Sequence, residues 1–160
     1  MRLKGIIEED FIQYKKPSMF LISCFCDWKC CNEAKVDISV CQNEPIVKNP
    51  TNNIDNEKIY NKYKANPITS SIVIGGLEPM LQFEEVYDLI KLFRDNNCVD
   101  DFIIYTGYYP DEIQDKVKKL SEFKNIIIKF GRFIPNRNSI FDEVIGVNLA
   151  SDNQFAIKIS

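Results

Sequence analysis

Four short, continuously apolar runs recur along the chain, each bounded by polar residues, glycine or proline. They are Ser18–Ser23, Ser70–Ile74, Asp101–Tyr105 and Asn125–Phe130. Apolar runs that do not alternate are typical of strands covered on both faces, as in parallel sheets. We therefore expect four buried strands in a mostly parallel sheet, with a further strand over Phe155–Ile159.

Between these runs, apolar residues recur with helical spacing. The pattern predicts helices over Asn56–Asn66, Phe83–Asp95 and Asp111–Phe123, each with an apolar stripe on one face. A short strand is also predicted over Val144–Asn148, where Gly146 weakens the pattern. Strands that alternate with helices at this spacing indicate an α/β fold with right-handed crossovers.

The length of the chain restricts which α/β fold it can form. Its 160 residues fit one domain, which we expect to span positions 1–160. A full eight-fold barrel typically needs about 250 residues. The sequence therefore predicts an open or partial (β/α) barrel with a mostly parallel sheet.

Composition and charge exclude several classes of function. The 20 basic and 23 acidic side chains are mixed along the sequence, and no basic block predicts binding to nucleic acid. No apolar run approaches the roughly 20 residues of a membrane helix, and the N-terminal segment lacks the apolar core of a signal peptide. We therefore expect a cytoplasmic protein. The absence of histidine excludes Ser-His-Asp and Cys-His catalysis and HExxH zinc sites.

Six cysteines are present, and five of them fall between positions 24 and 41. In a reducing compartment such a group is typical of a metal site rather than of disulfides. Two kinds of site remain open, namely a four-thiolate zinc site and a cubane iron–sulfur cluster. Zinc ribbons favour paired Cys-x2-Cys knuckles, which this chain lacks. The spacing therefore favours the iron–sulfur cluster.

The cysteine-rich segment offers more thiols than a three-ligand site needs. Cys26 and Cys30 have Cys-x3-Cys spacing, and Cys41 is the best third candidate. Cys24 and Cys31 compete for any of these places. Three thiolates would leave the fourth iron of a cubane open to a small molecule.

The pentapeptide GGLEP at positions 75–79 is a second candidate, because it joins a predicted strand to a predicted helix. Gly75 and Gly76 permit the backbone to approach a ligand closely, and Glu78 adds a carboxylate. The simpler interpretation is a strand-to-helix turn with Glu78 near a helix N-terminus, where carboxylates are favoured.

The third candidate, the sequence YTGY, follows the next predicted strand and supplies Tyr105, Thr106 and Tyr108. Ligands in α/β sheets bind beyond the carboxyl ends of the strands, so this loop is placed to line the same pocket. An ordinary core strand that ends in an aromatic turn would give the same pattern.

Taken in order, these features resemble the radical S-adenosylmethionine superfamily, and in particular the activating protein of anaerobic ribonucleotide reductase. The Cys-x3-Cys spacing after SMFLIS resembles the first half of the family's Cys-x3-Cys-x2-Cys motif, and GGLEP resembles its GGEP motif. YTGY is similar to the activases' own YTGY segment. FGRF at 130–133 resembles their DGRF, and SDNQ at 151–154 resembles the stretch before their last strand.

The chain departs from the family pattern at three positions. Glu33 stands where the third cysteine of the motif belongs, and Leu77 is inserted between the glycines and the glutamate. Phe130 stands where the activases have aspartate.

The resemblance implies two cofactors, a [4Fe-4S] cluster and S-adenosylmethionine. The cluster ligands would be Cys26, Cys30 and Cys41. Gly75, Gly76 and Glu78 would seat the amino group of S-adenosylmethionine, and Tyr105, Thr106 and Tyr108 would border its adenosine. The implied activity is reductive cleavage of S-adenosylmethionine to a 5′-deoxyadenosyl radical.

The implied partners are an electron donor and a protein substrate, either an anaerobic ribonucleotide reductase or another glycyl-radical protein. Two alternatives remain. One is a radical enzyme that acts on another protein or peptide, and the other is a non-catalytic iron–sulfur or zinc protein that serves in interactions.

Overall fold

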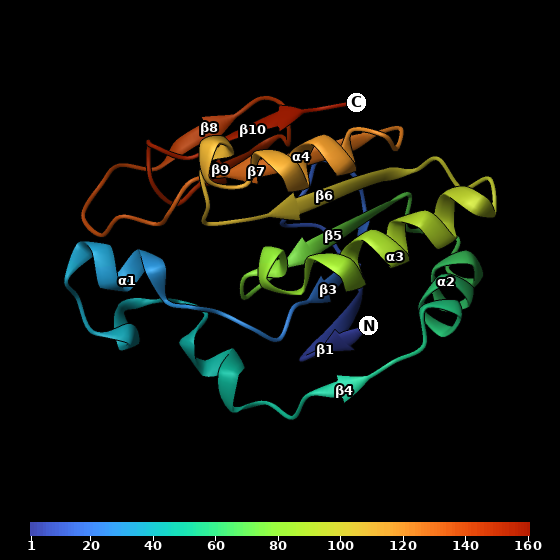
Figure 1. The fold of residues 1–160 in the computed structure, drawn as a ribbon, viewed down its shortest axis with the longest axis horizontal. Helices are drawn as coiled ribbons and strands as arrows, with labels where there is room; N and C mark the ends of the chain where they lie inside the picture. Colours follow the sequence, from blue (N-terminus) through green and yellow to red (C-terminus); the bar gives the residue numbers. More distant parts are fainter.

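A six-stranded sheet forms the centre of the molecule in the computed structural model, which describes all 160 residues (Figure 1). In spatial order its strands are β10 (Phe155–Lys158), β7 (Ile126–Phe130), β6 (Asp101–Tyr105), β5 (Ser71–Gly75), β3 (Ser18–Ile22) and β2 (Gly5–Asp10). The four inner strands pair in parallel, whereas β2 and β10 pair antiparallel at the two edges. The edge strands do not pair with each other, so the sheet is open, as expected for a partial barrel.

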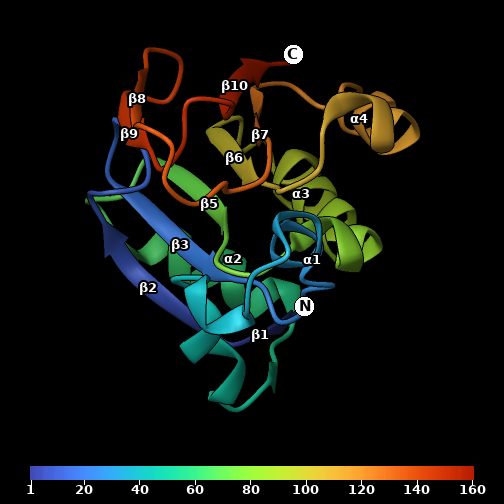
Figure 2. The ribbon, with the colours of Figure 1, turned by 90° about the vertical axis from the view of Figure 1, so that its left-hand side faces the viewer.

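Three helices cover one face of this sheet (Figure 2). They are α2 (Asn56–Ala65), α3 (Phe83–Asp95) and α4 (Gln114–Leu120). The helix face is the larger core, and its aromatic rings pack edge to face, with Phe93 5.0 Å from Tyr60 and 5.1 Å from Phe102 between ring centroids. Edge-to-face pairs of this kind add to the free energy gained by burying the rings.

Successive residues of the inner strands serve opposite faces, which explains why the strands do not alternate in polarity. Ile72 and Ile74 pack against the helices, whereas Val73 belongs to a second apolar cluster on the other face. That second face is covered by a C-terminal hairpin of β8 (Ile140–Asp142) and β9 (Val147–Leu149).

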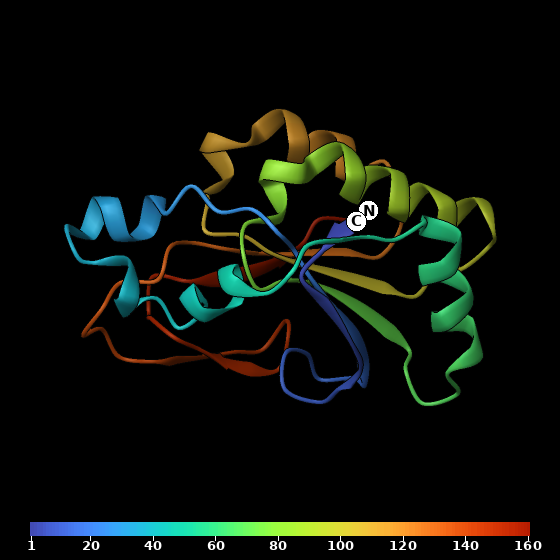
Figure 3. The same cartoon turned by 90° about the horizontal axis from the view of Figure 1, so that it is seen from below.

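The cysteine-rich segment lies at the end of the sheet where the parallel strands finish (Figures 1 and 3). It leaves β3, forms α1 (Lys29–Ala34), and passes through two 3-10 turns at Ile38–Val40 and Glu44–Lys48. It then returns along β4 (Asn52–Asn53), which pairs with β1 (Arg2–Leu3).

Most of the predicted elements are confirmed, with differences at the edges. The four buried parallel strands and the three helices occur where the sequence predicts them, although α4 begins only at Gln114, after a 3-10 turn at Pro110–Glu112. A further 3-10 turn at Pro79–Gln82 precedes α3. The pattern misses β2, whose GIIEED sequence is half exposed because the strand forms an edge of the sheet.

The strand predicted over Val144–Asn148 is displaced in the structure. It begins at Val147, because Gly146 has φ 72° and belongs to the turn that closes the β8–β9 hairpin. The prediction also missed α1, which is a short helix inside the cysteine-rich segment.

None of the helices has both the length and the apolar character needed to cross a membrane.

Candidate functional site

A cavity of about 230 Å³ opens at the carboxyl ends of the inner strands. The thiols of Cys26, Cys30 and Cys41 line one side of it, and they come from the loop after β3, the first turn of α1 and the end of the first 3-10 turn. The opposite side consists of residues at or just beyond the ends of β5, β6 and β7. These residues are Gly76, Leu77, Glu78, Tyr105, Thr106, Gly107, Lys129 and Gly131.

The three thiols of the cavity differ in their tendency to ionise. Burial raises the pKa of Cys26 to about 11. A hydrogen bond between the Cys41 and Cys30 side chains lowers the pKa of Cys30 and is the main cause of the raised pKa of Cys41. The Cys30 thiol therefore ionises most readily of the three.

The two competing cysteines lie outside the cavity lining. Cys24 is buried, and both its backbone N–H and its thiol contact Oε1 of Gln82, at 2.9 and 3.3 Å. Cys31 is buried, with its Sγ 3.9 Å from that of Cys30. All six cysteines are free thiols.

Left-handed backbone at both ends of α1 folds the cysteine segment into a compact loop. Trp28 precedes the helix at φ 57°, and Lys35 ends it at φ 53°. The Trp28 N–H donates to Sγ of Cys26 at 3.4 Å. Asp27 accepts a hydrogen bond of 2.6 Å from the Tyr108 hydroxyl, which ties this loop to the end of β6.

Close packing explains the two glycines of the GGLEP turn. Gly76 has φ 85°, and a Cβ there would lie 2.8 Å from Cγ2 of Ile22. A Cβ on Gly75 would lie 3.0 Å from Cβ of Tyr105. Both glycines therefore allow β5 to end close to its neighbours, and only Gly76 also lines the cavity.

Glu78 is buried, and its carboxylate accepts three hydrogen bonds from within the chain. Oε1 accepts from the Met80 N–H at 2.9 Å and from the Thr106 hydroxyl at 2.8 Å, and Oε2 accepts from the Gly107 N–H at 2.8 Å. Burial raises the pKa of Glu78, while these three bonds oppose the rise. The carboxylate thus joins the GGLEP turn to the YTGY loop, and Oε2 retains acceptor capacity.

The structure brings most of the predicted site residues together. Gly76, Glu78, Tyr105 and Thr106 line the same cavity as the three thiols. Tyr108 lies beside this cavity, in a small pocket that it shares with Cys26, Cys30 and Glu78. Gly75 ends β5 behind the cavity wall and does not line it. The Tyr105 hydroxyl is already engaged, since it donates to the backbone oxygen of Gln13 at 2.6 Å.

Lys129 is a cavity residue that the sequence analysis missed. It stands in β7 and is only 6% exposed, and burial lowers its pKa to about 8. Its ammonium donates one hydrogen bond, of 3.0 Å, to the backbone oxygen of Gly131. The available signal was a single charged residue inside the apolar run NIIIKF.

Arg132 joins the cysteine segment to the strand ends. Its guanidinium donates to Glu112 at 2.8 Å and to Glu33 of α1 at 2.9 Å. The hydrogen bond from Arg132 is the main cause that lowers the pKa of Glu112 to about 2, and bonds from Lys29 and the Tyr109 N–H add to it. Glu33, which stands at the motif's cysteine position, therefore has a structural partner here.

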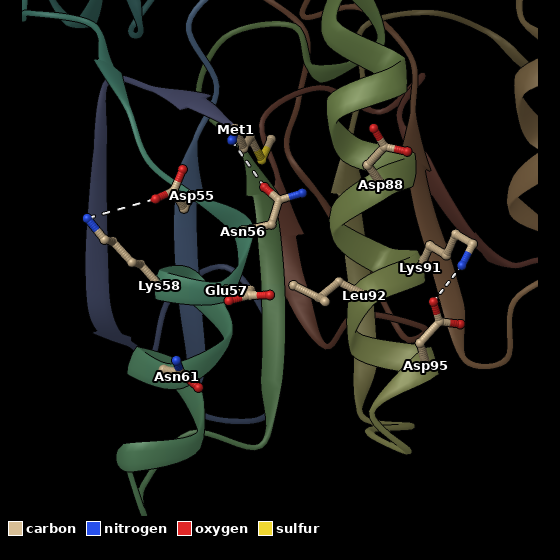
Figure 4. Close-up of a pocket in the computed structure, with 10 residues that line it drawn as sticks. All are labelled: Met1, Asp55, Asn56, Glu57, Lys58, Asn61, Asp88, Lys91, Leu92 and Asp95. Atoms are coloured by element: carbon tan, nitrogen blue, oxygen red, sulfur yellow. Dashed lines mark hydrogen bonds and ion pairs between the residues drawn. The ribbon is translucent and has the colours of Figure 1, made fainter.

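A larger groove of about 680 Å³ lies between α2 and α3 (Figure 4). It contains no cysteine, and its two lysines each pair with an aspartate of the groove, Lys58 with Asp55 and Lys91 with Asp95. These pairs are exposed, so their charges are already compensated by one another and by solvent. The groove shares no lining residue with the cavity of the three thiols.

Comparison with known proteins identifies the family. Residues 17–149 match the family model of the 4Fe-4S single cluster domain. The chain belongs to the 4Fe-4S single cluster domain family. No curated protein and no solved structure matched the chain.

The residues of the cavity fit the cluster that this family membership supports. Thiolates are the ligands of iron–sulfur clusters, and three free thiols line one cavity. No group of three or more Cys, Asp and Glu side chains converges closely enough to hold a single metal ion. Each thiolate of a cubane binds a different iron, so its ligands need not converge as those of one zinc ion do.

Proposed function

We propose that this 4Fe-4S protein is a radical S-adenosylmethionine enzyme that generates a glycyl radical on an anaerobic ribonucleotide reductase. One observation carries the proposal: three free thiols and the GGLEP and YTGY loops line a single cavity at the carboxyl edge of the sheet. A cluster with a purely structural role needs no adjoining cavity that is large enough to bind a small molecule.

In this proposal Cys26, Cys30 and Cys41 hold three irons of the cluster. The fourth iron would be left without a protein ligand and open to S-adenosylmethionine. Gly76 and the unfilled acceptor position on Glu78 would receive the amino group of S-adenosylmethionine, and Tyr105 and Thr106 would border its adenosine. Tyr108 acts indirectly, because its hydroxyl holds Asp27 and with it the cysteine loop.

A cluster held by Cys26, Cys30 and Cys41 would supply, from an external reductant, the one electron needed to cleave the C5′–S bond of S-adenosylmethionine into methionine and a 5′-deoxyadenosyl radical. Transfer of a hydrogen atom from a substrate glycine then yields 5′-deoxyadenosine and the glycyl radical. The protein positions these groups and limits access of water.

A protein substrate suits the surroundings of the cavity. A second hollow of about 300 Å³ adjoins it and shares Cys41, Tyr105 and Lys129 with it. Ile12 lines it and is 74% exposed, and the preceding residue in the chain, Phe11, is 64% exposed. Exposed apolar side chains beside a cavity are typical of a surface that receives another protein. We propose that a loop of the reductase enters here.

Anaerobic reconstitution tests the proposal. The protein is loaded with iron and sulfide, reduced, and incubated with S-adenosylmethionine while the electron paramagnetic resonance spectrum and 5′-deoxyadenosine are measured. We expect a cluster signal that changes when S-adenosylmethionine is added, together with 5′-deoxyadenosine. If the spectrum of the cluster does not change when S-adenosylmethionine is added, the proposed enzymatic activity is wrong, and the chain is a non-catalytic cluster protein.

The substrate requires a separate experiment. The reduced protein and S-adenosylmethionine are mixed with an anaerobic ribonucleotide reductase or with peptides, and the glycyl radical signal is recorded. Formation of 5′-deoxyadenosine without a glycyl radical on the reductase would favour a radical enzyme with another protein or peptide substrate.

A further inference from the structure

The cavity contains a buried positive charge that no group of the chain neutralises directly. Lys129 forms no ion pair with any carboxylate, and its ammonium donates only the bond to Gly131. An ammonium has three protons to donate, so two of them lack protein acceptors. Burying a charge without a partner is costly, and such a group is retained where a ligand completes it.

The surroundings of Lys129 direct it toward the cavity rather than toward solvent. It lines both the thiol cavity and the adjoining hollow, and its ammonium lies 5.9 Å from the centre of the Tyr105 ring. The same wall of strand ends carries the Glu78 carboxylate, whose charge partly offsets the effect of burial on the pKa of Lys129. The cavity therefore has one buried anion and one buried cation, a pattern that complements a zwitterion.

We propose that Lys129 binds the carboxylate of the amino-acid moiety of S-adenosylmethionine. This inference rests on the proposed function. The carboxylate is the one anionic group of that molecule, which otherwise carries an ammonium and a sulfonium. Charge-assisted hydrogen bonds are stronger than neutral ones.

A comparison of two ligands isolates this interaction. One is S-adenosylmethionine, and the other is its decarboxylated analogue, which lacks only the carboxylate. Dissociation constants are measured anaerobically with cluster-loaded wild type, Lys129→Met and Lys129→Arg. Lys158→Met serves as a control, because Lys158 is an exposed lysine on the neighbouring strand β10 and lines neither hollow.

We expect Lys129→Met to weaken binding of S-adenosylmethionine by about 10- to 100-fold and to leave binding of the analogue within about twofold. Lys129→Arg should recover part of the loss, and Lys158→Met should change neither constant. Met replaces the lysine stem with an apolar side chain of similar reach, so the fold should be retained, and circular dichroism checks this in each variant.

Three results would overturn the inference. If Lys129→Met weakens the binding of both ligands equally, Lys129 contributes through packing and not through its charge. If Lys129→Met leaves both affinities unchanged but shifts the reduction potential of the cluster, the charge of Lys129 acts on the cluster and not on the ligand. A wild-type protein that binds neither ligand would reject the proposed function as well, whereas equal affinity of wild type and Lys129→Met for S-adenosylmethionine, whatever the reduction potential, would reject this inference alone.

Discussion

The two walls of the thiol cavity are held in place by different kinds of contact. The strand-end wall is joined by buried backbone and side-chain hydrogen bonds, such as Ser23 Oγ to the Gly75 oxygen at 2.7 Å and the three bonds to Glu78. The cysteine wall is held mainly by charged and exposed side chains, among them Lys4, which donates to the backbone oxygens of Val47 and Asn49.

This difference separates a preformed ligand pocket from an adaptable set of metal ligands. Buried bonds between parallel strand ends fix the positions of Gly76, Glu78 and Thr106 whether or not metal is bound. Exposed polar contacts contribute little free energy each, so the cysteine segment has the lower local stability. We infer that cluster binding completes the order of this segment, because metal binding and folding are coupled in such loops.

The largest expected effect comes from removing a thiol of the cavity. Cys26→Ser, Cys30→Ser and Cys41→Ser should each lose most of the cluster, measured as iron and sulfide per chain and as absorbance near the thiolate-to-iron bands. The ligand count is then incomplete for a cubane with one open iron. Cys24→Ala and Cys31→Ala should retain it, because both side chains lie outside the cavity lining.

Cys98→Ala provides a control at the opposite end of the sheet. Cys98 is buried next to Asp100, where its Sγ lies 3.4 Å from the carboxylate. Retention of the cluster in Cys41→Ser together with its loss in Cys31→Ala would contradict the proposed ligand set and make Cys31 the third ligand.

The second prediction concerns the difference in order between the two walls. Anaerobic loading with iron and sulfide should slow hydrogen exchange of the amides between positions 24 and 49 by about 10-fold or more, because the metal stabilises the bound form of the loop. Exchange in β5 should remain unchanged. Equal protection of both regions would show that the strand-end wall is no more preformed than the cysteine wall.

The third prediction tests the stability of the scaffold behind the cavity. The Arg94 guanidinium at the end of α3 donates to the backbone oxygens of Cys98, Asp100 and Lys124, at 2.6, 3.0 and 2.6 Å. Arg94→Met leaves three carbonyl groups without this donor, so the free energy of unfolding in urea should fall by about 2–3 kcal/mol.

Lys91→Met is the matched control on the same helix. Lys91 is exposed and pairs only with Asp95, so its loss should change the free energy of unfolding by less than about 0.5 kcal/mol. An equally small effect for Arg94→Met would mean that water replaces its bonds without cost.

Sequence patterns predicted the scaffold better than the site, for a physical reason. Buried strands such as Ser71–Gly75 are specified by local apolar runs, and α3 by its apolar stripe. The antiparallel edge β2 is only half buried, so its sequence carries a weak signal. The edge position of a strand depends on which strands it pairs with, and a local pattern does not contain that information.

Within the site, the motifs predicted proximity but not every contact. The sequence placed Glu78 and Thr106 near one pocket, and the structure joins them by a hydrogen bond of 2.8 Å. Lys129 escaped prediction because its importance arises from burial and from the absence of an ion pair, which only the three-dimensional packing reveals. The sequence pattern included Arg132 only as part of the FGRF segment, and its link to Glu33 on α1 depends on the fold of the cysteine segment.

The smallest expected effect concerns the charged link between the two walls. The pKa of Glu112 is lowered to about 2, chiefly by Arg132, from an ordinary value of 4.5. A carboxyl group whose pKa falls on folding stabilises the protein above its unfolded pKa, and this contribution is lost as the pH falls toward the folded pKa. The stabilisation should therefore be present at neutral pH and disappear between about pH 5 and pH 2.

Glu112→Gln tests this link in protein without metal, so that acid lability of a cluster does not enter. At pH 7 and low salt the variant should lose about 1 kcal/mol of unfolding free energy, since the pair is partly exposed and screened. Near pH 3 the difference in unfolding free energy between Glu112→Gln and wild type should shrink. The control Glu122→Gln should have the unfolding free energy of wild type at every pH, because the Glu122 carboxylate has no contact to lose. A constant deficit at all pH values would instead indicate that glutamine packs less well than glutamate here, and that the charge of Glu112 contributes nothing, since glutamine can still accept the hydrogen bond from the Tyr109 N–H. The cysteine wall would then be joined to the strand ends by neutral contacts, and its stability would be insensitive to salt.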